Sequence, residues 1–124
     1  MKRSILHSVA LLAAISRVAT PQTPLNPWAG VGTQGTAVLQ GFSFAGAGRL
    51  DTLRLHYTTL GTPRKSADGV VRNAVMVLHG TGGTGRGFLN TTYAGGLFAP
   101  GKPLDSAKYF IILPDGIGDR RAHV

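Results

Sequence analysis

The sequence predicts an α/β fold in which an antiparallel hairpin leads into a parallel sheet. Apolar and polar residues alternate over 38–44 and again over 50–60, which is the period of strands with one buried face. The stretches 74–78 and 109–113 are continuously apolar, as in strands of a parallel sheet that are covered on both faces. The 30 residues between these two stretches are enough for a right-handed crossover between parallel neighbours.

The two alternating stretches form the expected hairpin, with a turn over the Ala- and Gly-rich residues 45–48. The second stretch has an apolar face and a polar face: Leu53, Leu55 and Tyr57 against Arg54, His56 and Thr58. A polar loop over 61–69 follows. Glycine and proline leave room only for short helices, which we expect over Thr84–Tyr93 and Asp105–Lys108.

The N-terminus has the features of an export signal. Lys2 and Arg3 form a positive start, residues 5–15 are apolar, and small residues follow. The apolar run is shorter than the ~20 residues that a helix needs to cross a bilayer. We therefore expect residues 1–20 to be a signal peptide, a secreted or periplasmic location, and no stable membrane span in the mature chain. An amphipathic helix of a cytosolic protein is the alternative.

The expected organisation places a Pro/Gly-rich linker over 21–36 and the domain over 37–124. Trp28, the only tryptophan, is either an anchor for this linker or a core residue.

The composition excludes several classes of protein. The 124 residues contain no cysteine, which rules out disulfides and cysteine-based zinc sites. The hydrophobic share of 43% is too high for a disordered chain. The formal net charge of +8 comes from scattered residues, without long basic runs or interleaved aromatic residues, so we expect no nucleic-acid partner. We also expect no metal and no cofactor.

Candidate chemistry lies where the two apolar strands end, because open α/β sheets bind ligands beyond the carboxyl ends of their strands. Residues 80–85 fit a dinucleotide fingerprint, but the glycines and prolines that follow prevent the full helix that it needs. Residues 96–102 fall short of a phosphate-binding loop, since Pro103 stands where a hydroxyl must bind Mg²⁺. Residues 41–45 resemble a nucleophile elbow, but a turn and a strand follow Ser43 instead of a helix.

The remaining interpretation is an oxyanion loop formed by His79, Gly80, Thr81, Gly82 and Gly83. Acyl-transfer enzymes use backbone N–H groups in such a loop to hold a tetrahedral oxyanion, and glycine allows close approach to a substrate. The candidate donors are the N–H groups of Thr81 and Gly82. We expect the His79 ring to hydrogen-bond the loop and fix it. A plain glycine-rich connection between strand and helix is the alternative.

Three blocks of sequence, within about residues 50–118, resemble the α/β-hydrolase superfamily: 55–61, 73–83, and 100–105 with 108–112. The last block is similar to the homoserine O-acetyltransferase branch. The resemblance implies the N-terminal part of an α/β-hydrolase fold and a small acyl or ester substrate in a complete parent. Gly80 stands where the transferases usually carry alanine, which favours a hydrolase.

The resemblance also implies a nucleophile, an acid and a histidine that would follow residue 113, and no catalytic residue is found. Outside 1–20 the serines are Ser43, Ser66 and Ser106, and none has a nucleophile-elbow context. We therefore expect a truncated or frame-shifted product that carries the oxyanion loop and is inactive alone. The alternatives are homoserine O-acetyltransferase-type acyl transfer in the complete parent, and a small secreted binding protein without catalysis.

Overall fold

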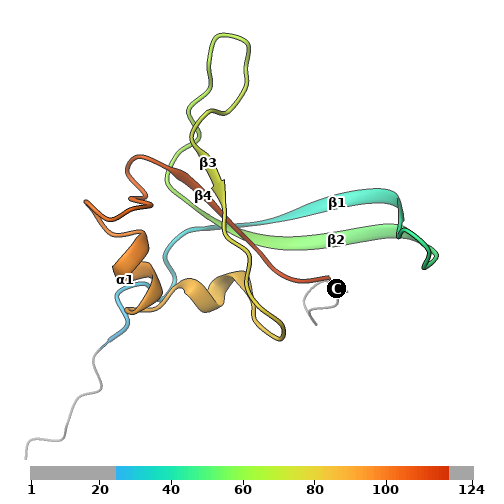
Figure 1. Ribbon diagram of the computed structural model, residues 1–124, viewed down its shortest axis with the longest axis horizontal. Coiled ribbons are helices and arrows are strands. Elements are labelled where there is room, and N and C mark those ends of the chain that lie inside the picture. The colour runs from blue at the N-terminus through green and yellow to red at the C-terminus, as the bar shows by residue number, and fades with distance from the viewer. Residues whose placement is uncertain (1–24, 118–124) are drawn as a thin grey trace, which may run out of the picture.

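The structure is a computed structural model that describes residues 25–117, so the expected signal peptide lies outside it and stays a prediction. The described residues form one four-stranded sheet in the order β1-β2-β4-β3 (Figure 1). Its strands are β1 (Thr33–Ser43), β2 (Arg49–Leu60), β3 (Ala74–Met76) and β4 (Phe110–Pro114). The connection from β3 to β4 contains the 3-10 helix η1 (Gly85–Phe88) and the α-helix α1 (Tyr93–Leu97).

The expected hairpin is confirmed, since β1 and β2 pair antiparallel from Thr33↔Thr59 to Ser43↔Arg49. Strand β1 begins inside the segment 21–36 that we expected to be a linker, because its ladder to β2 continues to Thr33. The expected parallel pair is also confirmed, between β3 and β4. Strand β2 pairs antiparallel with β4, so the sheet is mixed.

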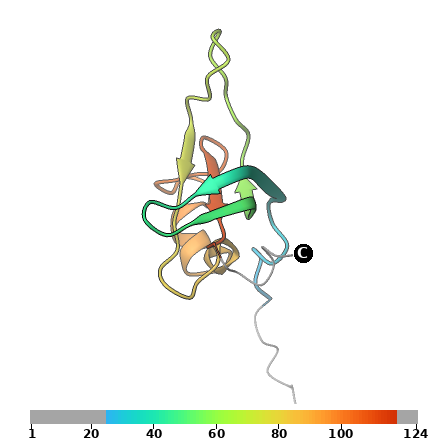
Figure 2. The same ribbon diagram turned by 90° about the vertical axis from the view of Figure 1, so that its right-hand side faces the viewer.

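The register of the strands divides the sheet into two faces. Leu60 lies opposite Ile111 across the β2–β4 pair, and Val75 lies opposite Ile111 across the β3–β4 pair. Side chains two residues apart share a face of a strand, so Leu113 lies on the same side as Ile111. Both helices cover this side (Figures 1 and 2). The buried core consists of Leu60, Leu89, Ala94, Phe98, Ile111 and Leu113.

The other face of the sheet has no covering element among residues 25–117. A shallow depression of about 330 Å³ lies on it, lined by Ala37, Leu55, Tyr57, Thr59, Met76, Phe110, Ile112 and Pro114. Met76 is 60% exposed and Leu78 is 70% exposed. The expectation that the two apolar strands are covered on both faces is therefore wrong for the described residues, because both short helices pack on the same side.

The helices also differ from the expected ones. Instead of one helix over Thr84–Tyr93, the chain makes one 3-10 turn, where the Thr84 hydroxyl accepts a hydrogen bond from the Gly87 N–H at 3.2 Å. The Asn90 side chain then accepts from the Tyr93 N–H at 2.9 Å, just where α1 begins. Residues 105–108 form a turn and not a helix.

The Asp105 carboxylate organises the turn over 105–108. The residue as a whole is only 5% exposed. It accepts hydrogen bonds from the Gly101 N–H at 2.8 Å and from the Ala107 N–H at 2.9 Å. The Gly101 N–H, the Ala107 N–H and the charge of Lys108 together hold the pKa of Asp105 below its usual value. A carboxylate that serves two separate amides favours a local turn over a continuous helical ladder.

The segment before β1 is attached to the core. Trp28 is half-buried and packs against the core cluster, as an anchor for this segment would. The Asn26 side chain donates to the Leu89 carbonyl at 2.8 Å. These contacts hold the start of the described chain on the side of the sheet that carries the helices.

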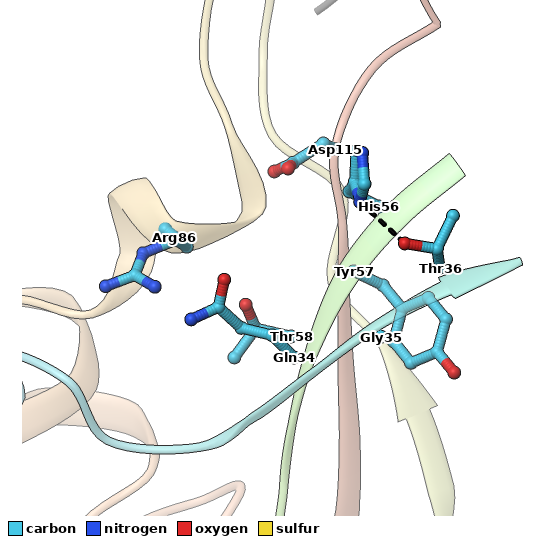
Figure 3. Close-up of a pocket in the computed structure, with 8 residues that line it drawn as sticks. All are labelled: Gln34, Gly35, Thr36, His56, Tyr57, Thr58, Arg86 and Asp115. Atoms are coloured by element: carbon cyan, nitrogen blue, oxygen red, sulfur yellow. Dashed lines mark hydrogen bonds between the residues drawn. The ribbon is translucent and has the colours of Figure 1, made fainter. Parts of the chain in front are cut away.

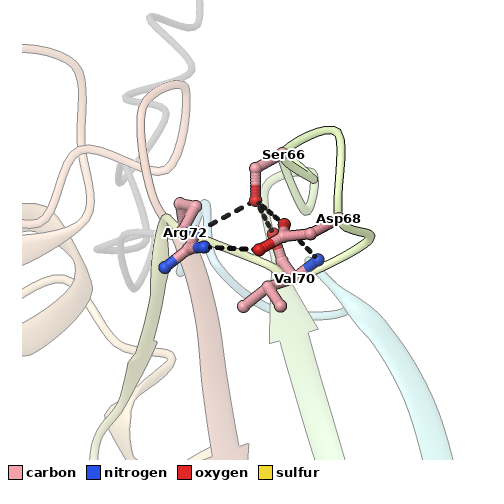
Figure 4. Close-up of polar contacts among 4 residues, drawn as sticks. All are labelled: Ser66, Asp68, Val70 and Arg72. Carbon is pink, nitrogen blue, oxygen red and sulfur yellow. Dashed lines mark hydrogen bonds and ion pairs between the residues drawn. The ribbon is translucent and has the colours of Figure 1, made fainter.

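The loop 61–73 between β2 and β3 projects beyond the sheet (Figure 1). Four residues hold it together (Figure 4). The Ser66 hydroxyl donates to Asp68 Oδ1 at 2.5 Å, and Arg72 Nη2 pairs with Asp68 Oδ2 at 2.8 Å. Hydrogen bonds from the Ser66 hydroxyl and, to a smaller extent, from the Val70 N–H hold the pKa of Asp68 below its usual value.

No helix within residues 25–117 is long and apolar enough to cross a bilayer.

Candidate functional site: the turn after β3

The chain makes a tight turn over residues 80–83, separated by three residues from the end of β3, at the predicted oxyanion loop. The Gly83 N–H donates to the Gly80 carbonyl at 3.0 Å, which closes a four-residue turn. Gly82 has a φ of 75°, as the third residue of a type II turn requires. Glycine adopts this left-handed conformation without strain, and this explains its presence at the position.

The two predicted donors occupy the middle of this turn. Thr81 and Gly82 are exposed, and neither N–H donates to another group within the part of the chain that the structure describes. The next residue in the sequence, Gly83, uses its own N–H to close the turn. The turn therefore presents two consecutive amides with unused hydrogen-bonding capacity at the carboxyl end of a strand.

The His79 ring is hydrogen-bonded to the turn. Its Nδ1 donates to the Gly80 carbonyl at 2.8 Å, since a carbonyl can only accept. The ring also lies against the loop after β4, because a Cβ added at Gly116 would be 3.3 Å from His79 Cε1. One histidine thus joins the ends of two neighbouring parallel strands.

A cavity of about 220 Å³ lies beside the turn. Its lining residues are His79, Gly80, Gly83, Thr84, Gly87, Phe88 and Tyr93. The rings of Phe88 and Tyr93 meet edge to face with centroids 5.5 Å apart, so the far wall is aromatic. Three of the five predicted loop residues line this cavity, whereas Thr81 and Gly82 lie at the tip of the turn and do not.

No role was predicted for Asp115, but in the structure its side chain anchors η1 to the end of β4. Its Oδ1 accepts a hydrogen bond from the Gly85 N–H at 2.8 Å and so connects the end of β4 to the start of η1. Gly85 is buried and packs on the Leu113 carbonyl so closely that a Cβ would overlap it. An aspartate after the second apolar strand and a glycine six residues after His79 were the available signals, but only the fold brings them together.

The three serines within the described residues lie where no nucleophile elbow can form. Ser43 ends β1 and is followed by a turn and β2, Ser66 belongs to the loop 61–73, and Ser106 lies in the turn before β4. Nucleophilic serines of this kind need a strand before them and a helix after them. Within residues 25–117 there is also no group of three or more His, Asp or Glu side chains that could hold a metal ion.

Comparisons with known proteins give a likeness among solved structures. No protein family matches the sequence, and no curated protein matches it. Among solved structures, the chain is similar to the homoserine O-acetyltransferase from Bacillus anthracis, an α/β-hydrolase, with a TM-score of 0.53 and 23% identity. The likeness covers 67% of this chain and 23% of that protein, so this chain spans less than a quarter of its length. At this level of identity the likeness concerns the fold alone, and the four-stranded mixed sheet with its two short helices fits a partial α/β fold.

Proposed function

We propose that this chain supplies the oxyanion-binding turn of an α/β-hydrolase-type site for acyl transfer or ester hydrolysis. The observation that carries the proposal is the pair of unused N–H groups of Thr81 and Gly82, held by a hydrogen-bonded turn at the carboxyl end of β3. Donors that are already in place when charge develops on an acyl oxygen lower the barrier, because no reorganisation is needed. The fold likeness to an O-acetyltransferase supports this class of chemistry.

The expected substrate is a small acyl ester. When a nucleophile adds to its carbonyl carbon, the carbonyl oxygen becomes negative, and the two amides would donate hydrogen bonds to it. The aromatic wall formed by Phe88 and Tyr93 would contact the apolar part of the acyl group. In this scheme His79 positions the turn through the hydrogen bond from its Nδ1 to the Gly80 carbonyl.

The nucleophile is not supplied by residues 25–117, since none of Ser43, Ser66 and Ser106 follows a strand and precedes a helix. The described part of the chain would therefore bind an oxyanion without forming an acyl-enzyme. Homoserine O-acetyltransferase-type transfer, the alternative, would use the same turn with a specific alcohol as acceptor.

The proposal can be tested with monoethyl butylphosphonate, a tetrahedral anion that resembles the intermediate. In the full ¹⁵N-labelled chain, the amide resonances of Thr81 and Gly82 should shift saturably, while those of Gly46 and Gly48 in the β1–β2 turn should not. Thr81→Pro removes one donor but suits the second position of a type II turn, where proline is common. We expect it to weaken binding about tenfold, the usual effect of one hydrogen bond to a charged group.

The matched control is Ala67→Pro. Ala67 is also the second residue of a turn, closed by the Gly69 N–H on the Ser66 carbonyl at 2.9 Å, but this turn lies in the loop that precedes β3. It should leave phosphonate binding unchanged. Equal binding by Thr81→Pro and the unsubstituted chain would contradict the proposal.

A further inference from the structure

A second cavity, of about 240 Å³, lies between the β1–β2 hairpin, η1 and the end of β4 (Figure 3). It is smaller than most ligand pockets, which are about 300–1,000 Å³. Its lining residues are Gln34, Gly35, Thr36, His56, Tyr57, Thr58, Arg86 and Asp115. None of them lines the cavity beside His79, so the two cavities are separate.

One wall of this cavity is built by the hairpin register. Gln34 pairs with Thr58, and Thr36 pairs with His56, so these four side chains lie on one face of the hairpin. Thr36 Oγ1 lies 2.8 Å from His56 Nδ1, and this contact fixes one end of the wall. At the other end, Gln34 and Thr58 place an amide and a hydroxyl side by side.

Thr58 is the most telling residue of this wall. It is 3% exposed, yet its hydroxyl makes no hydrogen bond within the described residues. The hydroxyl lies in the same space as the Gln34 amide (Figure 3). No buried side-chain oxygen or nitrogen among the described residues lacks a hydrogen-bond partner, so the Thr58 hydroxyl is accessible from this cavity and is available to a ligand there.

The opposite wall carries two opposite charges. Arg86 is half-buried and makes no side-chain hydrogen bond or ion pair within residues 25–117. Asp115 uses Oδ1 for the Gly85 N–H, and its Oδ2 accepts nothing within those residues. Arg86 and Asp115 line the same cavity without pairing with each other. Two opposite charges that line one small cavity without pairing are complementary to a ligand that itself carries both charges.

We propose that this cavity binds a small amino acid. Its carboxylate would be held by the Arg86 guanidinium, with the Thr58 hydroxyl and the Gln34 amide as further donors. Its ammonium group would donate to the free oxygen of Asp115. The inference goes beyond the oxyanion turn, since it assigns a ligand to residues that take no part in acyl chemistry.

The test is a titration of the full ¹⁵N-labelled chain with L-alanine and with 4-aminobutyrate, which differ in the separation of their charges. The Gly35 and Gly85 amides lie in or next to the cavity wall and report binding. The matched half-ligands are propionate and ethylamine for alanine, and butyrate and propylamine for 4-aminobutyrate. We expect one amino acid to bind at least about tenfold more tightly than either of its halves, because a charged hydrogen bond usually contributes that much.

Substitutions separate the two ends of the site. Asp115→Asn keeps an acceptor for the Gly85 N–H, so it should weaken amino-acid binding about tenfold without weakening that of the carboxylate half. Arg86→Gln and Thr58→Val should weaken the binding of the amino acid and also that of its carboxylate half. The matched controls, Asp51→Asn and Arg54→Gln, change exposed side chains of β2 and should alter neither.

Two results would overturn the inference. In one, the carboxylate half binds as tightly as the amino acid, which would make this a simple anion site. In the other, neither amino acid produces a saturable shift at Gly35 or Gly85. Thr81→Pro should leave amino-acid binding unchanged, so failure of this inference and failure of the proposed function can be told apart.

Discussion

The Asp115 carboxylate accepts a hydrogen bond from the Gly85 N–H at 2.8 Å, so the residue after β4 holds the first residue of η1. The two residues are 30 positions apart in the chain. The bond closes the connection that carries the proposed oxyanion turn, and it leaves one Asp115 oxygen for the second cavity. A single carboxylate thus has both a structural contact and a proposed ligand contact, and substitutions can separate them.

Asp115→Ala should lower the free energy of unfolding by about 1–2 kcal/mol, because the N–H of the buried Gly85 loses its acceptor. Asp115→Asn keeps an oxygen at the same place and should cost less than half as much. Urea denaturation of the two variants checks this, with Asp51→Ala as the control for loss of an exposed carboxylate. Equal destabilisation by alanine and asparagine would show that charge, and not the hydrogen bond, is what matters.

Gly85→Ala should destabilise the chain by about 1–3 kcal/mol, the usual cost of overpacking a tight site. The added Cβ would overlap the backbone carbonyl of Leu113, which cannot move without disturbing β4. Gly96→Ala is the matched control: its Cβ meets nothing within 4 Å, and it lies inside α1. That change should stabilise by about 0.5–1 kcal/mol, since alanine loses less conformational entropy in a helix. Thermal unfolding of both variants tests the contrast.

Acid should weaken the turn around Asp105. Its pKa in the folded chain is held below the ordinary value of 3.8 by the Gly101 and Ala107 N–H groups and by Lys108. The stabilisation is therefore complete above the ordinary pKa and is lost as the pH falls through the lowered one. Unfolding free energies measured between about pH 2 and pH 7 should lose part of this dependence in Asp105→Asn. Asp68, whose pKa is also lowered, accounts for a further part of the pH dependence.

A fluorophosphonate probe should leave the purified chain unlabelled. Such probes react with serines that a neighbouring base activates, and Ser43, Ser66 and Ser106 lack the strand-to-helix context of such a site. Mass spectrometry of the intact chain gives the result. Stoichiometric labelling of any of the three would contradict the expectation that the described residues supply no nucleophile.

A hydrophobic dye should bind the open face of the sheet, which carries Met76 and Leu78 at its β3 edge. Replacing both residues with serine should reduce dye fluorescence and aggregation, because it removes the two most exposed apolar side chains of that face. Val38→Ser serves as the control, since Val38 is 51% exposed but shares its face with the polar side chains of Thr36 and Gln40. An equal reduction by this control would indicate general loosening and not a defined apolar face.

The positions of the strands were predictable from the sequence, but the pairing of the strands with one another was only partly predictable. Period-two alternation identified the hairpin, and two apolar runs identified the parallel pair. Nothing local to β2 shows that its last four residues pair with β4, because this pairing joins Thr58 to Leu113 through more than half of the described chain. The side of the sheet that the helices cover depends on that register.

Of the candidate site, the turn after β3 was predictable from the sequence, but the residues that line the cavity beside it were not. The residue types of His79 and of the glycines after it are enough to predict a tight turn. The aromatic wall beside the turn depends on where η1 and α1 begin, and this is set by the Thr84 and Asn90 side chains. The second cavity was missed because Thr58, Arg86 and Asp115 come from three separate elements, and each alone is an ordinary polar residue.

The position of β4 also affects how the chain is made. This strand is the last of the described strands in sequence but lies between β2 and β3. Strand β3 does not pair with β2, so it has no neighbour until residues 110–114 leave the ribosome. Synthesis proceeds at about 5–20 residues per second, and the wait lasts roughly a few seconds. During that interval the apolar segment Ala74–Met76 is open to chaperones and to other nascent chains, and the arrival of β4 ends that exposure.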